Sequence, residues 1–314
     1  MKPILNKKNG TLNIGMIIMS VFFLGIFIHS CDKDNFEITD NDSPKSVPDV
    51  INTNVDFSSK ITNPYDFIGK YHNEGLQFVI DEHRKSPKLK AGQELDEQIK
   101  ELVVSYMKKN DVFKSSGMKP SINFSSISVL NEIDLKQVKL KSDNLFPIKG
   151  QQIHYEKLKK VFSKKNLSSP QALISYINEI ECNIINDKKL KEEEITQLLI
   201  TTSVAKYSSI FWIEALLKAD NKRSGIRLKN GSEPGWNFSD WWQDTFMPSA
   251  QEVVEADFEG AAAGAIIGVL VGAGAGSVAP GAGTVTVGVT GAIVGGAQGA
   301  IGSSAFKGFQ MVFW

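Results

Sequence analysis

The residue with the clearest chemical role is Cys31, because a thiol can be acylated and this one follows an uncharged apolar run. Three lysines give the first eight residues a positive charge, and no acidic residue offsets them. The apolar run covers residues 14–28, which is shorter than the roughly 20 residues that a membrane-spanning helix needs. Its length matches the apolar region of a secretory signal. The sequence therefore predicts a signal peptide over residues 1–30 that is cleaved before Cys31.

The end of this signal, Ile28-His29-Ser30-Cys31, resembles the lipobox of bacterial lipoproteins, which reads apolar, small, small, cysteine. His29 departs from that pattern because it is larger than the usual small residue. The resemblance implies that the Cys31 sulfur is diacylated and that Cys31 becomes the mature N-terminus. Two or three acyl chains anchor a protein stably, whereas a single chain binds only marginally. The alternatives are an ordinary signal peptide with a chance cysteine and an uncleaved anchor helix.

The lipobox has consequences for location, partners and the second cysteine. It predicts a lipid-anchored protein of the bacterial cell envelope, at the outer membrane, with membrane lipid as its partner. We expect no cofactor apart from the covalent lipid on Cys31. With Cys31 acylated, Cys182 would be a free thiol buried among isoleucines, and no intramolecular disulfide could form.

Charge is distributed unevenly along the chain, although the 35 basic and 35 acidic residues balance overall. Residues 61–230 hold 28 basic and 21 acidic side chains, residues 231–259 hold seven acidic and no basic ones, and residues 260–306 hold no charge. Such changes of composition indicate separate physical environments. The predicted parts are an acidic flexible tether (31–60), an α-helical domain (61–230), an acidic linker containing tryptophans (231–259), a glycine-rich segment (260–306) and an aromatic tail (307–314).

Residues 61–230 carry apolar side chains at helical spacing and no convincing strand alternation. Asn63-Pro64 and Ser169-Pro170 are favourable helix starts, since each pairs an N-cap residue with a proline in the first turn. The further expected helices cover residues 95–106, 129–138, 153–162 and 192–217. The predicted fold class is therefore all-α, with a helical domain followed by a glycine-rich helical hairpin.

The glycine-rich segment has a strict spacing of four residues in two arms separated by Pro280-Gly281. Glycines at this spacing lie on one helix face and let two helix backbones approach closely. Each interior glycine costs about 1 kcal/mol of helix propensity, so a solvated helix would not tolerate five of them. The predicted helix-packing residues are Gly260, Gly264, Gly268, Gly272 and Gly276 in the first arm and Gly291, Gly295 and Gly299 in the second.

The two arms resemble glycine-zipper two-helix membrane domains, which occur in outer-membrane lipoproteins and in some bacteriocins. The stretch from Asn63 to Glu74, followed by such a tail, is also similar to uncharacterised lipoproteins of Bacteroidota, a family without a settled activity. The resemblance implies a hairpin that inserts into a membrane or associates with itself, so a homo-oligomer through the glycine face is a possible assembly. The alternatives are a flexible Gly/Ala tail and a hairpin buried inside the helical domain.

Aromatic residues flank the uncharged segment on both sides. Trp241 and Trp242 precede it, and Phe309, Phe313 and Trp314 follow it. Amphipathic aromatic rings are typical of membrane interfaces, so these side chains could form an interfacial belt. The alternative is that both tryptophans pack against the helical domain.

The sequence contains no recognisable catalytic constellation. The histidines after the signal are His72, His83 and His154. His72 and His83 lack the pairing at i and i+4 of a zinc-binding helix, and we expect them at the surface or as capping residues. We therefore predict no catalytic residue, no metal site, no nucleic-acid partner and no small-molecule ligand. The predicted function is that of a non-enzymatic envelope lipoprotein, and the alternative is a membrane-permeabilising, bacteriocin-like toxin.

Overall fold

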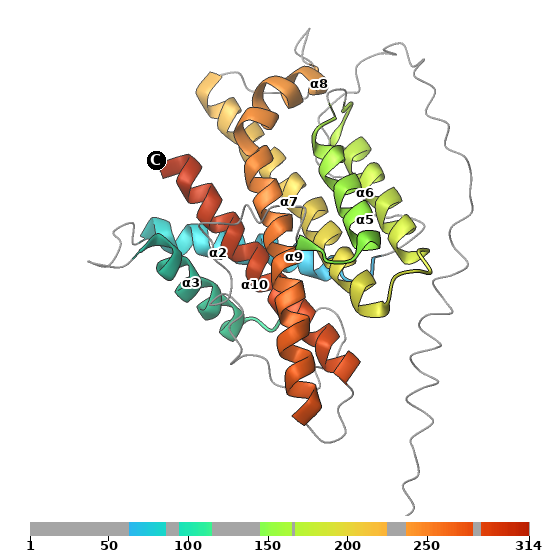
Figure 1. Ribbon diagram of the computed structural model, residues 1–314. Helices are drawn as coiled ribbons and strands as arrows, with labels where there is room; N and C mark the ends of the chain where they lie inside the picture. The colour runs from blue at the N-terminus through green and yellow to red at the C-terminus, as the bar shows by residue number, and fades with distance from the viewer. Residues whose placement is uncertain are drawn as a thin grey trace, which may run out of the picture. The chain divides into compact units, whose positions relative to one another are not determined.

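The computed structural model describes six stretches of the chain (Figure 1), which are residues 63–85, 94–114, 145–164, 167–224, 237–278 and 284–313. Cys31, the predicted signal peptide and tether, and the expected helix over residues 129–138 lie outside the described residues. The described part of the chain is helical and contains no strand, which confirms the all-α fold class.

The helices of the basic part follow the periodicity of the sequence closely. They are α2 (Asp66–Lys85), α3 (Leu95–Lys109), α5 (Lys149–Phe162), α6 (Pro170–Ile185) and α7 (Glu192–Ser224). The start of α6 illustrates why: the Ser169 hydroxyl oxygen accepts a 3.0 Å hydrogen bond from the Ala172 amide, and Pro170 occupies the first turn.

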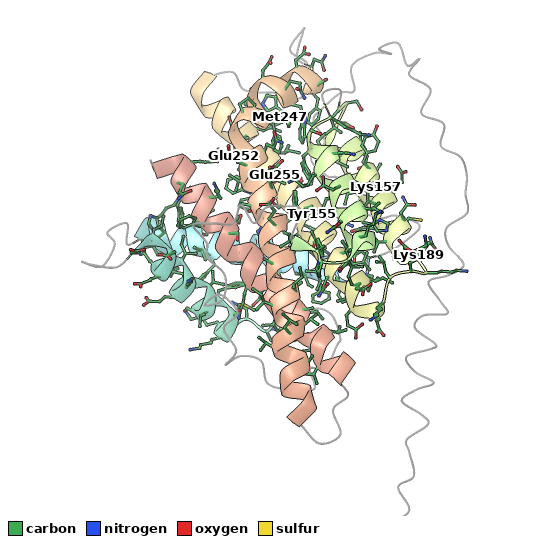
Figure 2. The ribbon with its side chains drawn as sticks, viewed as in Figure 1. Tyr155, Lys157, Lys189, Met247, Glu252 and Glu255 are labelled. Carbon is green, nitrogen blue, oxygen red and sulfur yellow. The ribbon has the colours of Figure 1, made fainter. Side chains whose placement is uncertain are left out.

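The remaining helices form the C-terminal part of the chain. They are α8 (Phe238–Trp241), the π-helical turn η4 (Trp242–Phe246), α9 (Met247–Val278) and α10 (Thr284–Phe313). The prediction of a linker over residues 231–259 is wrong for the described residues 238–259, because these residues are helical and lead directly into α9. Apolar side chains of this stretch enter the core. Among its acids, Glu252 is exposed and Glu255 is half-buried (both labelled in Figure 2), whereas Asp257 and Glu259 are buried.

The tryptophans of this stretch contribute to that core. Trp242 is fully buried and stacks on Phe246, with ring centroids 4.1 Å apart. Trp241 is partly buried against the same cluster. At the other end of the uncharged segment, Phe309 is buried and stacks on His83 at 4.3 Å. These rings pack against helices, as the alternative to an interfacial belt requires.

Two hydrophobic clusters lie on opposite sides of α7 and α9. One gathers side chains from α2, α3 and α10, and the other gathers side chains from α5, α6, α8 and η4. Both α7 and α9 contribute to each cluster, since Ile200 and Ala261 belong to the first, and Leu199 and Phe258 to the second. In Figure 1, α9 accordingly runs between α10 on one side and the α5–α6 pair on the other.

Candidate functional site

Helices α9 and α10 pack against each other through the glycines of the periodic pattern. The facing pairs are Gly260 with Gly299, Gly264 with Gly295, and Gly268 with Gly291. The residue numbers run in opposite directions, so the two helices are antiparallel. Gly272 faces the Val287 carbonyl in the same row, and Gly276 also lies within α9.

The backbones at these pairs leave no room for a side chain. A Cβ atom added at Gly264 or Gly268 would lie under 3.0 Å from the backbone carbonyl of the facing glycine, closer than real Cβ atoms approach. Gly291 and Gly295 meet the same obstruction from the opposite side. A second copy of the chain could use this face only after α9 and α10 had separated.

Glycines outside the periodic pattern bring α2 against the pair and against α7. A Cβ atom at Gly75 of α2 would collide with Ile301 of α10, and one at Gly69 would collide with Tyr207 and Ser203 of α7. The Gly69 amide also donates a 3.0 Å hydrogen bond to the Ser203 hydroxyl. The sequence gives only a weak sign of this packing, namely isolated glycines inside a helical pattern.

The two ends of the α9–α10 pair have different surroundings. From Ala261 to Ala265 every residue of α9 is buried among the other helices. Farther along α9, apolar side chains become exposed, and Leu270 is 68% exposed. We call this the distal segment and define it by its partly or fully exposed apolar residues: Ile266, Ile267, Val269, Leu270, Val271 and Val289.

The helical body also contains a buried ionic cluster around Lys206 of α7. The Lys206 ammonium lies 2.8 Å from a carboxylate oxygen of Asp66 and 2.9 Å from one of Glu181, and it donates to the Asn178 side chain at 3.3 Å. Burial raises the pKa of both carboxyl groups, although the nearby ammonium opposes that change. The cluster ties the start of α2 to α6 and α7.

A second buried polar cluster surrounds Asp257 of α9. Its Oδ2 atom accepts hydrogen bonds from the Ser208 hydroxyl and, at 3.1 Å, from Trp212 Nε1. His72 Nε2 lies 3.9 Å from the same oxygen, and Ser304 of α10 also faces the carboxyl group. Both Asp257 and His72 are fully buried. Burial raises the pKa of Asp257 to about 7 and lowers that of His72 to about 4.

The Asp257 cluster contains the residue types of a hydrolase triad in the wrong order. In such a triad the histidine lies between the serine and the aspartate, so that it can take the serine proton. Here the aspartate lies between Ser208 and His72. Ser208 therefore donates directly to the carboxyl group and not to a histidine.

The positions of the histidines and of Cys182 differ from the predictions. His72 and His83 are buried and not at the surface, because each packs into a helix interface, where His72 contacts the Asn73 side chain and His83 stacks on Phe309; His154 is buried as well and contacts Asp187. Cys182 lies half-buried on α6, with its sulfur 3.5 Å from the Asn186 side-chain amide, so the expectation that it is buried among isoleucines is wrong.

Comparison with protein-family models, with curated proteins and with solved structures gives no match. Among the described residues, Phe238–Ala273 is the one helical stretch long and apolar enough to cross a membrane by length and composition. Of its apolar window, 67% is buried inside the protein, which is also typical of the core helix of a soluble protein. No group of three His, Cys, Asp or Glu side chains in the described stretches could hold a metal ion.

Proposed function

We propose that this chain is a non-enzymatic lipoprotein of the bacterial envelope, anchored by lipid on Cys31, whose distal segment makes a second contact with a membrane. The observation that supports it is the contrast along the part of α9 and α10 that carries no charge. Residues Ala261 to Ala265 are packed inside the helical body, whereas in the distal segment Leu270 is exposed and its apolar neighbours are partly exposed. Exposed contiguous apolar surface is typical of membrane or protein contacts.

Residues 260–306 carry no charge, which favours lipid as the partner over a polar protein surface. Transfer of one exposed leucine into an apolar phase is worth roughly 1.5–3 kcal/mol, so the distal segment alone would bind only weakly. Acyl chains on Cys31 would hold the protein near the bilayer and make that second contact effectively intramolecular. The two contacts therefore reinforce each other.

The lipid anchor itself is testable by the mass of the peptide that contains Cys31. We expect the mature protein to begin at Cys31 with acyl chains on its sulfur, and Cys31→Ser to abolish them. Acylation and disulfide formation at the same sulfur exclude each other. A peptide with Cys31 joined to Cys182 by a disulfide would therefore contradict the lipoprotein assignment.

A charge in the distal segment should weaken membrane binding without unfolding the body. In the full chain carrying Cys31→Ser, Leu270→Lys is expected to lower binding to phosphatidylethanolamine–phosphatidylglycerol vesicles at least about tenfold, because it replaces a favourable transfer with a costly one. Leu270 is 68% exposed, so the folded state loses little packing. Vesicle co-flotation measures the binding.

The matched control is Met311→Lys, which charges another exposed apolar side chain, 41% exposed, near the far end of α10. Binding that falls equally in both variants would assign the effect to charge in general. Complete release of the Cys31→Ser protein from membranes by carbonate would argue against any second membrane contact.

A second candidate function is permeabilisation of a membrane. It is favoured by the apolar window of Phe238–Ala273, which has the length of a membrane span and is now mostly covered by other helices. If the apolar window of Phe238–Ala273 separated from the other helices, its side chains would be exposed to lipid. Dye leakage from vesicles at micromolar full-length protein would support this function, and intact vesicles that nevertheless bind the protein would exclude it.

A further inference from the structure

The two oxygen atoms of the Asp257 carboxyl group differ in their hydrogen bonds. Its Oδ2 atom accepts two hydrogen bonds, from Ser208 and Trp212, whereas its Oδ1 atom is buried without a hydrogen-bond partner. The Ser304 hydroxyl, which faces the carboxyl group from α10, is likewise buried and unpartnered. Buried polar atoms are normally paired. The Ser304 hydroxyl can donate to Oδ1 of an ionised carboxyl group or accept from a protonated one, so the groups around Asp257 supply hydrogen bonds but no cation to offset a buried charge.

The tautomer of His72 gives an independent reason for a proton. The Asn73 side-chain amide donates to the Tyr207 carbonyl at 3.0 Å, so its Oδ1 atom is the acceptor that lies 2.9 Å from His72 Nδ1. Nδ1 is therefore the protonated ring nitrogen. Nε2 then presents a lone pair towards Asp257 Oδ2 at 3.9 Å, an arrangement that an ionised carboxylate would destabilise.

We infer that Asp257 and the side chains around it form a buried proton-binding site, with the proton on Asp257 Oδ1, that holds α9 and α10 against α2 and α7. The elements meet at this one carboxyl group, since His72 comes from α2, Ser208 and Trp212 from α7, and Ser304 from α10. Loss of the proton leaves a buried charge without a cation. This inference does not depend on membrane contact.

The groups that face Asp257 determine the sign of the pH effect. His72 is the titratable one, and it is neutral above about pH 4 because burial lowers its pKa. Ser208, Trp212 and Ser304 do not titrate. The charged and titratable groups that α5 brings against α9, Lys159 and Tyr155, interact with Glu259 instead of Asp257. The pKa of Asp257 is about 7 in the folded protein and 3.8 for an ordinary aspartate carboxyl group. The proton on Asp257 therefore contributes most to the free energy of unfolding below pH 3.8, and this contribution is lost as the pH rises to about 7.

Asp257→Asn tests the site because asparagine imitates the protonated acid. Its carbonyl oxygen can accept from Ser208 and Trp212, and its amide can donate to Ser304. The unfolding constant of the full-length wild type, divided by that of Asp257→Asn, is expected to rise about tenfold per pH unit between pH 4 and 7, about a thousandfold in total, and then to level off. Denaturant titrations at each pH measure both constants.

Glu252→Gln is the matched control, since Glu252 lies on the same helix, is 67% exposed and pairs with Lys307 at only 4.0 Å. Its ratio to wild type should stay flat over the same pH range. As a direct readout, infrared spectra of the wild type at pH 6 should contain a protonated carboxyl band that Asp257→Asn removes. A flat ratio for Asp257→Asn, or the absence of that band, would overturn the inference.

Discussion

Alanine at Gly264 or Gly268 is expected to destabilise the protein by about 3 kcal/mol or more. The added Cβ atom would lie under 3.0 Å from the backbone of Gly295 or Gly291, and backbone atoms cannot rotate away as a side-chain tip can. The helices must therefore separate, and α10 would lose contact with α2 and α7 as well. Overpacking in a well-packed core costs typically 1–3 kcal/mol, and rigid backbone contacts lie at the upper end. Thermal and denaturant unfolding measure the loss.

Gly288→Ala is the control on the same pair of helices. A Cβ atom there would lie 3.7 Å from Val269 Cγ1, an ordinary van der Waals contact. Alanine also has better helix propensity than glycine by about 1 kcal/mol, so this variant should be as stable as the wild type or slightly more stable. If Gly264→Ala and Gly288→Ala behaved alike, close backbone approach would not be what the glycines provide.

The facing positions should also be coupled. Gly264→Ala and Gly295→Ala obstruct the same approach from opposite sides, so one substitution already forces the helices apart. The double variant is expected to lose clearly less stability than the sum of the two single losses. Additive losses would mean that the two glycines make separate contacts.

The sequence predicts the helices well wherever one face is buried. In α2, α3, α5 and α6 apolar residues recur at helical spacing, and Ser169-Pro170 marks the start of α6 correctly. The C-terminal region is harder because α9 is covered on several sides, by α10, by α7 and by α5. A helix that is buried on both sides has no single apolar stripe, and its acids resemble those of a solvated linker.

The buried polar clusters could not be predicted because their members are distant in sequence. Asp257 is 45 and 49 residues from Trp212 and Ser208, and Lys206 is 25 residues from Glu181. Local composition gives no sign that these groups meet. The spacing of the periodic glycines, in contrast, is a local property that already places them on one helix face.

Lys206→Met is expected to cost about 3–5 kcal/mol, because it leaves the buried carboxyl group of Glu181 without a cation and removes the closer cation from the partly buried one of Asp66. The Lys206 side chain is 1% exposed, and methionine can fill much of its volume, so the loss is mainly electrostatic. Lys218→Met, which removes a 75% exposed lysine of the same helix from a 3.7 Å pair with Glu214, should change stability by less than about 1 kcal/mol.

The pH dependence of the Lys206→Met deficit separates a charge effect from a packing effect. Lys206 holds the pKa of Asp66 and Glu181 below the values that burial alone would impose, so its removal raises both. The variant then binds protons more tightly when folded, and its deficit should shrink as the pH falls and the carboxyl groups become neutral. Adding Glu181→Gln, which keeps an oxygen for Asn63 and Thr202, should restore part of the stability at neutral pH. A deficit that stayed constant with pH and was not relieved by this second change would show that Lys206 contributes by packing, and that the ionic cluster does not hold α2 to α6 and α7.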